Sequence, residues 1–175
     1  MGTVKKAPSN FSDAPAGAMS LYELEVTSLS GEKVALSDFK GKKLVIVNTA
    51  SKCGFTNQYD DLQKLHEKHG DKVVLIGVPS NDFGNQEPGG EKDIQEFCRL
   101  NYGVSFLMLE KLPVKGKEKS PLYQWLTDPK QNGWNDQEPK WNFCKYIINE
   151  DGKLTHFFGS SVTPFSEKFM KALEI

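Results

Sequence analysis

The fold is decided by residues 43–79, which read KLVIVNTASKCGFTNQYDDLQKLHEKHGDKVVLIGVP. The stretch begins and ends with a run of largely apolar residues, as expected of two strands buried on both faces of a sheet. Between the runs, Tyr59, Leu62 and Leu65 recur at helical spacing, and Gly70 ends the predicted helix. Strand, helix and strand in so short a stretch form a βαβ unit, so the two strands are expected to lie parallel in one sheet.

Further elements flank this unit on both sides. We expect a β-hairpin over 21–36, a helix over 91–100, a short strand over 106–109, a helix over 121–127, a hairpin over 145–158 and a final helix that opens at Thr163-Pro164. Residues 1–20 are expected to form a flexible N-terminal tail, which leaves 21–175 as one domain. This order describes an α/β domain with a thioredoxin-like fold, in which helices flank a central mixed β-sheet and a β-hairpin lies near the N-terminus.

The composition is nearly neutral in charge and excludes two function classes. The 175 residues carry 22 Lys+Arg and 23 Asp+Glu, a formal net charge of −1, so no excess of cations is present to neutralise the phosphates of a nucleic acid. The apolar runs fall far short of the roughly 20 residues that a membrane-spanning helix needs. We therefore expect no nucleic-acid partner and no membrane span. We also expect a cytoplasmic protein, or a periplasmic or exported one if a signal segment has been removed ahead of residue 1.

The chain has three cysteines, Cys53, Cys98 and Cys144, which do not make the disulfide framework of a small secreted domain. Cys53 lies in the loop between the first strand of the βαβ unit and its helix, where sites form in open α/β sheets. The nearby helix N-terminus and Lys52 favour the thiolate, which is the reactive form, and Gly54 leaves room for a substrate beside the sulfur. The alternative is an inert thiol buried in the core.

The neighbours of Cys53 distinguish its loop from those of two other kinds of thiol enzyme. Three residues after it stands Thr56, so the chain lacks the Cys-x-x-Cys motif of dithiol oxidoreductases. Three residues before it stands Ala50, at the place where the Thr-x-x-Cys motif of peroxiredoxins has threonine. Neither motif therefore describes this thiol.

Four motifs follow one another along the chain. They are NTASKCGFT at 48–56, PSNDFGNQEPG at 79–89, FCRLNYGVSF at 97–106 and WNF at 141–143. In this order they resemble the glutathione peroxidase family, in its cysteine rather than its selenocysteine form, and the resemblance extends over 21–175. It implies a thiol peroxidase in which Cys53 is the peroxidatic residue and Gln86, Trp141 and Asn142 complete a catalytic tetrad.

These residue types also suit peroxide reduction on chemical grounds. A thiolate that attacks an O–O bond becomes a sulfenic acid and releases an alkoxide or hydroxide, which must receive a proton or hydrogen bonds. The amides of Gln86 and Asn142 and the indole of Trp141 offer N–H donors for this purpose. Taken singly, the same three residues could instead cap a turn, end a strand and anchor the core.

The resemblance also implies how the sulfenic acid is removed. Cys98 matches a position at which family members carry a resolving cysteine, so we expect a Cys53–Cys98 disulfide. A disulfide requires Cα atoms within about 7 Å, so the predicted helix unwinds locally if the two thiols begin further apart. The alternative is that Cys98 is a core thiol on the apolar face of its helix. We expect Cys144 to be a packing residue.

The expected partners follow from this disulfide. Thioredoxin-like dithiols reduce disulfides through a mixed disulfide, and similar family members typically prefer thioredoxin to glutathione, so we expect peroxide substrates and a thioredoxin-like or glutathione reductant. Segment 128–140 lacks the longer insertion of tetrameric relatives, which favours a monomer or weak dimer. No cofactor and no metal are expected, because there is no Gly-x-Gly-x-x-Gly run and the pair His66 and His69 lacks further ligands.

Three positions depart from the commonest family pattern: Ser80 replaces a third cysteine, Asp82 a glutamine and Leu107 a proline. None of them removes a tetrad residue, and Asp82 leaves Gln86 as the tetrad candidate of its loop. The same thiol chemistry also suits a peroxide sensor that passes its oxidation to a partner protein, and turnover kinetics separate the two. A scaffold with decayed chemistry is a third alternative, which the intact tetrad disfavours.

Overall fold

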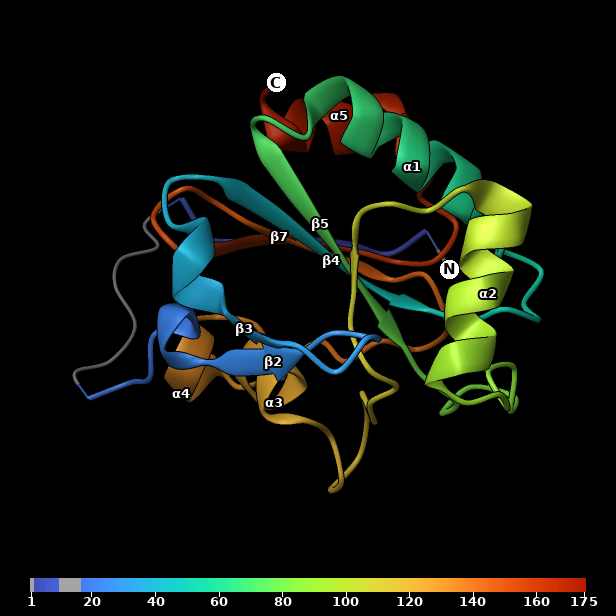
Figure 1. Cartoon of the computed structure of the whole chain (residues 1–175). Helices are drawn as coiled ribbons and strands as arrows, with labels where there is room; N and C mark the ends of the chain where they lie inside the picture. Colours follow the sequence, from blue (N-terminus) through green and yellow to red (C-terminus); the bar gives the residue numbers. More distant parts are fainter. Residues whose placement is uncertain (1, 10–16) are drawn as a thin grey trace.

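The protein is built around one six-stranded mixed sheet (Figure 1). The computed structural model describes residues 2–9 and 17–175. The strands are β1 (Val4–Lys6), β4 (Lys43–Thr49), β5 (Val73–Pro79), β6 (Leu107–Met108), β7 (Lys145–Ile148) and β8 (Leu154–Phe158). They lie in the order β1-β8-β7-β4-β5-β6; β4, β5 and β6 run parallel, and the other neighbours pair antiparallel.

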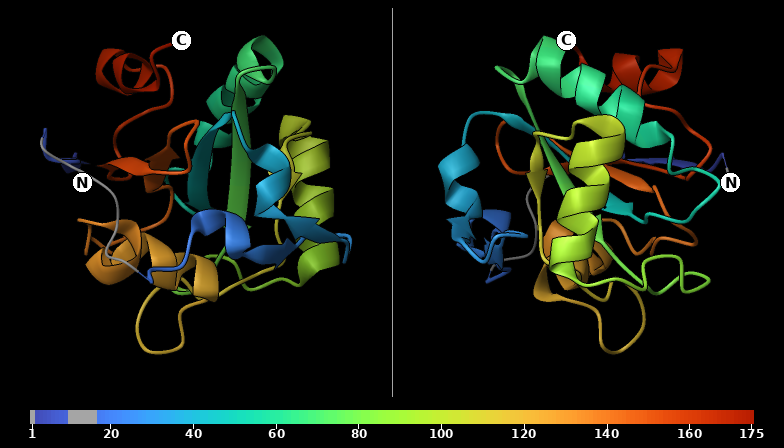
Figure 2. Two further views of the ribbon diagram at one scale, coloured as in Figure 1. Left: turned by 90° about the vertical axis from the view of Figure 1, so that its left-hand side faces the viewer. Right: turned by 45° about the vertical axis from the view of Figure 1, so that its right-hand side comes forward.

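Helices cover both faces of the sheet (Figures 1 and 2). They are α1 (Gln58–His69), α2 (Glu91–Tyr102), α3 (Pro121–Thr127), α4 (Pro129–Asn132) and α5 (Glu167–Leu173). α1, α2 and α5 pack on one face, whereas α3 and a two-stranded hairpin, β2 (Glu25–Thr27) and β3 (Lys33–Ala35), cover the other, with α4 beside α3. The fold is α/β, with a mixed sheet flanked by helices and a hairpin near the N-terminus, as predicted.

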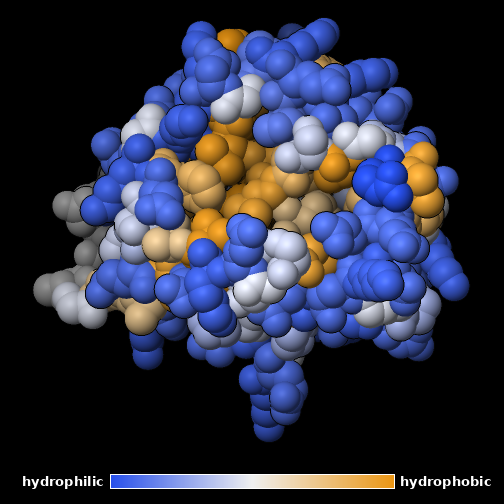
Figure 3. Space-filling view, in the orientation of Figure 1, coloured by the Kyte–Doolittle hydropathy of each residue, from blue (hydrophilic) through white to orange (hydrophobic). Residues whose placement is uncertain are grey.

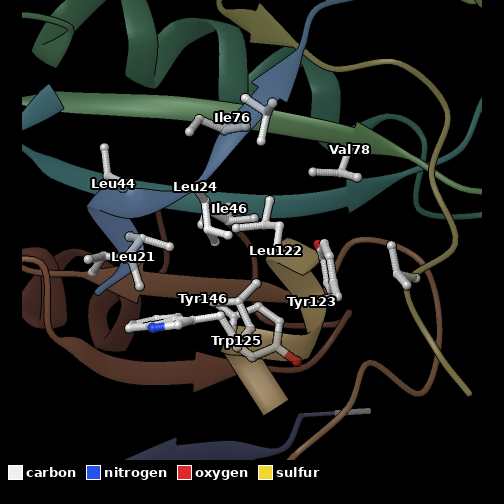
Figure 4. Packing of buried hydrophobic residues seen from close by; sticks show 14 of the residues in the cluster. Leu21, Leu24, Leu44, Ile46, Ile76, Val78, Leu122, Tyr123, Trp125 and Tyr146 are labelled. Atoms are coloured by element: carbon white, nitrogen blue, oxygen red, sulfur yellow. The ribbon is translucent and has the colours of Figure 1, made fainter. Parts of the chain in front are cut away.

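The side chains of β4 alternate between two apolar cores. Leu44 and Ile46 belong to the core under α3 and the hairpin, and Val45 and Val47 to the core under the longer helices; all four are at most 1% exposed. Figure 4 shows Leu44 and Ile46 in the first core, facing Leu122 and other residues of the helical layer. Burial on both faces explains why the strand reads as a continuous apolar run.

The predicted βαβ unit is confirmed. β4 and β5 pair in parallel from Lys43 opposite Val73 to Thr49 opposite Pro79, and α1 lies between them in the chain. α1 covers one face of these strands. The loop between the end of β4 and the start of α1 therefore lies at the edge of the sheet, at the carboxyl ends of its parallel strands.

The predicted hairpin over 21–36 is shorter in the structure. Its expected first strand begins instead with a 3₁₀ turn, Leu21–Glu23. The Ser20 N–H donates to the Glu23 carboxylate at 2.6 Å, and the Ser20 hydroxyl accepts the Tyr22 N–H at 3.2 Å. This capping box stabilises a helical turn at residues whose alternating polarity indicates a strand.

Two further predictions need correction. Val4–Lys6, expected in a flexible tail, pair as β1 with β8; residues 1 and 10–16 of that tail lie outside the described residues. The sequence predicts that the final helix opens at Thr163-Pro164, but the helix begins at Glu167. The Ser166 N–H donates to the Thr163 carbonyl at 3.1 Å and closes a turn. Because this turn comes first, the helix begins several residues after Pro164.

Candidate active site

The Cys53 loop, residues 50–57, lies at the carboxyl end of β4 and is held in shape by Thr56. The Thr56 hydroxyl accepts the Cys53 N–H at 2.9 Å and donates to the Ala50 carbonyl at 2.8 Å. The partly exposed Cys53 Sγ accepts the Phe55 N–H at 3.3 Å. Thr56, which stands where a Cys-x-x-Cys motif has its second cysteine, thus holds the Cys53 loop in its conformation.

Lys52 and Gly54 flank the thiol, and both are exposed. A Cβ atom added at Gly54 would meet no other atom within 4 Å, so the surface beside the sulfur is open. The Lys52 N–H donates to the Gln86 carbonyl at 3.0 Å, which joins the Cys53 loop to the loop after β5. Burial raises the pKa of the Glu87 carboxyl in that loop, and the positive charge of Lys52 is the smallest of the effects that oppose this rise.

Gln86 and Asn142 come together from loops that are far apart in sequence. Asn142 is fully buried, and its Nδ2 donates to Gln86 Oε1 at 3.1 Å. Asn48 holds the Asn142 segment in place, because its Nδ2 donates to the Trp141 carbonyl at 2.9 Å and its Oδ1 accepts the Cys144 N–H at 3.0 Å. Gln86, Trp141 and Asn142 therefore meet at the end of β4, where the Cys53 loop begins.

Phe143 takes a backbone conformation that is unusual for a large residue. Its φ angle is 64°, it is fully buried, and its N–H donates to the Asn48 carbonyl at 2.6 Å. Its ring meets the ring of Tyr59 edge to face, with centroids 5.4 Å apart. A left-handed residue of this size costs of the order of 1–3 kcal/mol and is concentrated at functional sites. Here the turn aims Asn142 at Gln86.

Trp141 lies over the loop after β5. Its ring contacts that of Phe83, with centroids 5.9 Å apart. Gly84 has a φ of 63°, and a Cβ there would lie 3.0 Å from Trp141 Cη2, so glycine alone satisfies both the conformation and the contact. Asp82, a departure from the family pattern, anchors the same loop by accepting the Val114 N–H at 2.6 Å.

Cys98 is buried on α2, and the three cysteines are all free. Burial raises the pKa of the Cys98 thiol to about 11; the Tyr59 hydroxyl lowers it and the charge of Glu87 raises it, both to smaller extents. Cys98 lines a cavity of about 330 Å³ between the hairpin, α2 and β6, and Figure 3 shows apolar residues gathered in a hollow on the face of Figure 1. Cys53 packs against the apolar cluster that contains Cys98.

Cys144 is a buried thiol in the opposite core. It is 1% exposed, and its Sγ donates to the Trp141 carbonyl at 3.3 Å and lies 3.6 Å from the Ser160 hydroxyl. These contacts agree with a packing residue that supports the segment carrying Trp141.

Glu87 is a site residue that the sequence did not predict. It is 1% exposed; its N–H donates to Asn81 Oδ1 at 2.9 Å, and the Lys111 ammonium donates to its carbonyl at 3.2 Å. Burial raises the pKa of its carboxyl, while Ser51, Lys111 and Lys52 lower it. Nothing in the sequence marks this glutamate, because charged residues are usually exposed.

Residues 2–9 and 17–175 contain neither a cluster of metal ligands nor a membrane-spanning helix. In that part of the chain, no group of three or more His, Cys, Asp or Glu could hold a metal ion. Over the same residues, no helix has the length and apolar character needed to cross a membrane. His66 packs edge-on against Phe106, with ring centroids 6.2 Å apart.

Known proteins resemble the chain over most of its length. Residues 21–127 match the family model described as Glutathione peroxidase. The chain is 46% identical over 151 residues, 86% of this chain and 96% of the relative, to "Glutathione peroxidase homolog BsaA" of Halalkalibacterium halodurans. It is 43% identical over 152 residues, 82% of this chain and 89% of the relative, to "Hydroperoxy fatty acid reductase gpx1" of Synechocystis sp..

A solved structure agrees with these relatives on the fold. The structure described as "Crystal structure of Trgpx in apo form" matches with a TM-score of 0.68 and 33% identity, and the match covers 91% of this chain and 98% of that chain. The fold is thus thioredoxin-like, as predicted. The chain belongs to the glutathione peroxidase family of peroxide-reducing oxidoreductases.

Proposed function

We propose that the protein reduces hydrogen peroxide and organic hydroperoxides with the thiolate of Cys53. The observation that carries this proposal is the position of the thiol. Cys53 is partly exposed, and its loop is joined to the next one by the hydrogen bond from the Lys52 N–H to the Gln86 carbonyl. The Gln86 side chain in turn accepts a hydrogen bond from Asn142. The Cys53 sulfur attacks the O–O bond, an S–O bond forms and the O–O bond breaks. The released alkoxide takes a proton and leaves as an alcohol, and Cys53 becomes a sulfenic acid.

The hydrogen bond between the two amides supports a role for Gln86 as a donor to the peroxide. Because Asn142 donates to Gln86 Oε1, the Gln86 Nε2 is turned toward other partners. The indole N–H of Trp141 is a second neutral donor from the same edge of the sheet. Preorganised donors of this kind are often the largest single contribution to catalysis, about 10²–10³-fold for one group.

The second step we propose is resolution by Cys98. Its thiol attacks the Cys53 sulfenic acid, an S–S bond forms and water leaves. A thioredoxin-like dithiol, or glutathione, then reduces the disulfide. The open surface beside Gly54 supports bulky hydroperoxides as substrates, in keeping with the fatty acid hydroperoxides named for the Synechocystis relative.

Steady-state turnover with two reductants tests this function. Consumption of hydrogen peroxide and of a fatty acid hydroperoxide is measured with thioredoxin and with glutathione, for the wild type, Cys53→Ser, Cys98→Ser and Cys144→Ser. We expect Cys53→Ser to be inactive, Cys98→Ser to lose thioredoxin-coupled turnover while still forming a sulfenic acid, and Cys144→Ser, the matched control with a buried thiol, to behave as wild type.

Two results would contradict the proposal. Peroxidase activity retained by Cys53→Ser removes that thiol from the reaction. A wild type that is oxidised once, slowly, and is not recycled by either reductant points instead to a peroxide sensor that passes its oxidation to a partner protein.

A further inference from the structure

Lys145, the first residue of β7, buries its ammonium against the loop between β8 and α5. It has no exposed surface. Its Nζ donates to the Ser160 carbonyl at 3.2 Å and to the Val162 carbonyl at 2.6 Å. Within the part of the chain that the structure describes, no carboxylate forms an ion pair with it. A buried charge without an opposite charge beside it is costly, so stability alone does not explain a lysine at this position.

The Ser160 carbonyl also joins this loop to α1. Gln58, the first residue of α1, is 5% exposed, and its Nε2 donates to the Ser160 carbonyl oxygen at 2.7 Å. Its Oε1 is buried and has no hydrogen-bond partner among the described residues. An apolar side chain would fill the same space without burying that oxygen, so the hydrogen bond to Ser160 explains the amide better than packing does. One carbonyl oxygen thus accepts hydrogen bonds from two buried side chains, one from β7 and one from α1.

Two further hydrogen bonds link Gln58 to the thiol. The Gln58 N–H donates to the Phe55 carbonyl at 2.9 Å. The Phe55 N–H donates to Cys53 Sγ at 3.3 Å. A displacement of Gln58 therefore moves the N–H group that reaches the sulfur.

The Cys53 loop is anchored on both sides of the thiol. Thr56 bonds through its hydroxyl only to atoms of the loop itself, so this hydroxyl sets the shape of the loop and not its place in the molecule. The Lys52 N–H, before the thiol, reaches the loop after β5. The Gln58 amide, after the thiol, reaches the loop between β8 and α5. The second anchor is effective only where that loop is itself held in place.

We propose that Lys145 is a positioning residue for Cys53, an inference that rests on the peroxidatic role proposed above for that thiol. Its ammonium fixes the Ser160 carbonyl, that carbonyl fixes the Gln58 amide, and Gln58 holds the segment that directs the Phe55 N–H at the sulfur. Lys145 acts through these contacts and not on the peroxide itself. Attack on an O–O bond requires a well-placed sulfur, and a misplacement of about 1 Å can slow a reaction roughly a hundredfold.

Three variants and one control test this inference. The variants are Lys145→Met, Gln58→Met and the double variant, which remove the two donors to the Ser160 carbonyl singly and together. The control is Lys43→Met. Lys43 is also a buried lysine, 8% exposed, but it lies at the start of β4, away from the thiol loop, with its Nζ 3.6 Å from carboxylate oxygens of Glu150 and Glu174.

The measurements separate the position of the thiol from its turnover. Stopped-flow kinetics with hydrogen peroxide gives the rate constant for oxidation of Cys53. Mass spectrometry of the Cys53 peptide gives its rate of alkylation by iodoacetamide, which needs no peroxide. The resonance and the hydrogen exchange of the Phe55 amide, followed by NMR in the reduced protein, report the hydrogen bond to the sulfur. Urea denaturation at pH 7 verifies that each variant is folded.

We expect Lys145→Met and Gln58→Met each to slow the oxidation and the alkylation of Cys53 by roughly ten- to a hundredfold. In both variants the Phe55 amide resonance shifts and its hydrogen exchange accelerates. The double variant is no slower than Gln58→Met, because the position of the Ser160 carbonyl no longer matters once its link to α1 is lost. Lys43→Met keeps the wild-type rates and the wild-type Phe55 resonance.

Four results would overturn a claim, and they are distinguishable. Wild-type rates of Cys53 oxidation and alkylation in Lys145→Met would remove Lys145 from the positioning of the thiol and leave the peroxidatic role of Cys53 intact. Equal losses in Lys43→Met would mean that the effect reflects stability, and losses that multiply in the double variant would mean that Lys145 and Gln58 act independently. A wild type whose Cys53 is alkylated but not oxidised by hydrogen peroxide would contradict the proposed function itself.

Discussion

Lys145 is a lysine with no exposed surface, in the strand that follows the Asn142 turn. Its ammonium donates to the carbonyls of Ser160 at 3.2 Å and Val162 at 2.6 Å. Burial lowers its pKa to about 7. Two neutral carbonyls do not fully replace the hydration of an ammonium, so a cost of burying the charge remains.

This lysine makes stability depend on pH in a definite direction. Its pKa of about 7 in the folded protein lies below the ordinary value of 10.5, so between these pH values the unfolded chain binds more protons than the folded protein. The free energy of unfolding therefore rises with pH across that window, by up to about 1.4 kcal/mol per pH unit.

Lys145→Met isolates this effect. We expect the free energy of unfolding of the wild type, minus that of the variant, to increase as the pH is raised from 7 to 9 and to be level below pH 6. Urea denaturation at several pH values measures the difference. A difference that does not change with pH would mean that Lys145 keeps an ordinary pKa in the folded protein.

Gly84 gives a second prediction at the scale of one residue. Gly84→Ala places a methyl group 3.0 Å from the Trp141 ring at a φ of 63°. We expect it to lose about 1–2 kcal/mol of stability from the backbone conformation and to lower kcat/KM by displacing Trp141. Chemical denaturation and peroxide kinetics measure the two effects.

Gly116→Ala is the matched control for that variant. Gly116 has a similar φ of 73°, but a Cβ there meets nothing within 4 Å. It should lose similar stability and keep its activity. Equal losses of activity in both variants would show that Trp141 is not positioned by Gly84.

At the scale of elements, the central strands could be predicted and the ends of the domain could not. β4 and β5 are buried on both faces, and their continuous apolar runs therefore predict buried strands. Leu24 and Val26 alternate with Glu23 and Glu25 like a strand, but a local capping box at Ser20 and Glu23 overrides that pattern at its start. β1 has three exposed residues and depends on pairing with β8, a long-range contact that its own sequence does not encode.

Some residues of the candidate site could likewise be predicted from the sequence, and others could not. Cys53, Gln86, Trp141 and Asn142 were predicted because they lie in motifs. Glu87 was not predicted, because its burial depends on tertiary packing that no local sequence pattern shows. α1 itself begins at Gln58 rather than directly after the thiol, since turns such as those closed by the Thr56 and Gln58 N–H groups come first.

The pairing of β1 with β8 gives a prediction at this scale. A variant that lacks residues 2–9 loses the antiparallel hydrogen bonds of Val4–Lys6 but little apolar burial, since all three residues are exposed. We expect a loss of about 1–2 kcal/mol in stability, unchanged peroxidase kinetics, and more aggregation because the edge of β8 is uncovered. Thermal unfolding and light scattering measure these effects; identical unfolding curves would mean that the segment behaves as a tail.

For the molecule as a whole, the arrangement of the cores determines where chemistry can occur. One core lies on each face of the sheet, so the thiol loop, the loop after β5 and the Asn142 turn can meet only at the edge of the sheet, at the end of β4. A site at an edge is open to substrates, and the faces remain free to stabilise the fold.

We predict that the protein is a monomer, on the basis of the surface formed by the described residues. Among the described residues, the large apolar side chains with substantial exposure are Val4 at 43%, Met19 at 44% and Leu100 at 69%, which lie on three separate segments. A permanent dimer interface buries about 2,000 Å² or more and is largely apolar. We expect light scattering to give a mass near 19.6 kDa in the reduced and the oxidised states. Leu100→Glu is the control for weak association through α2 and should leave the mass unchanged; a mass of twice this value at micromolar concentration would contradict the prediction.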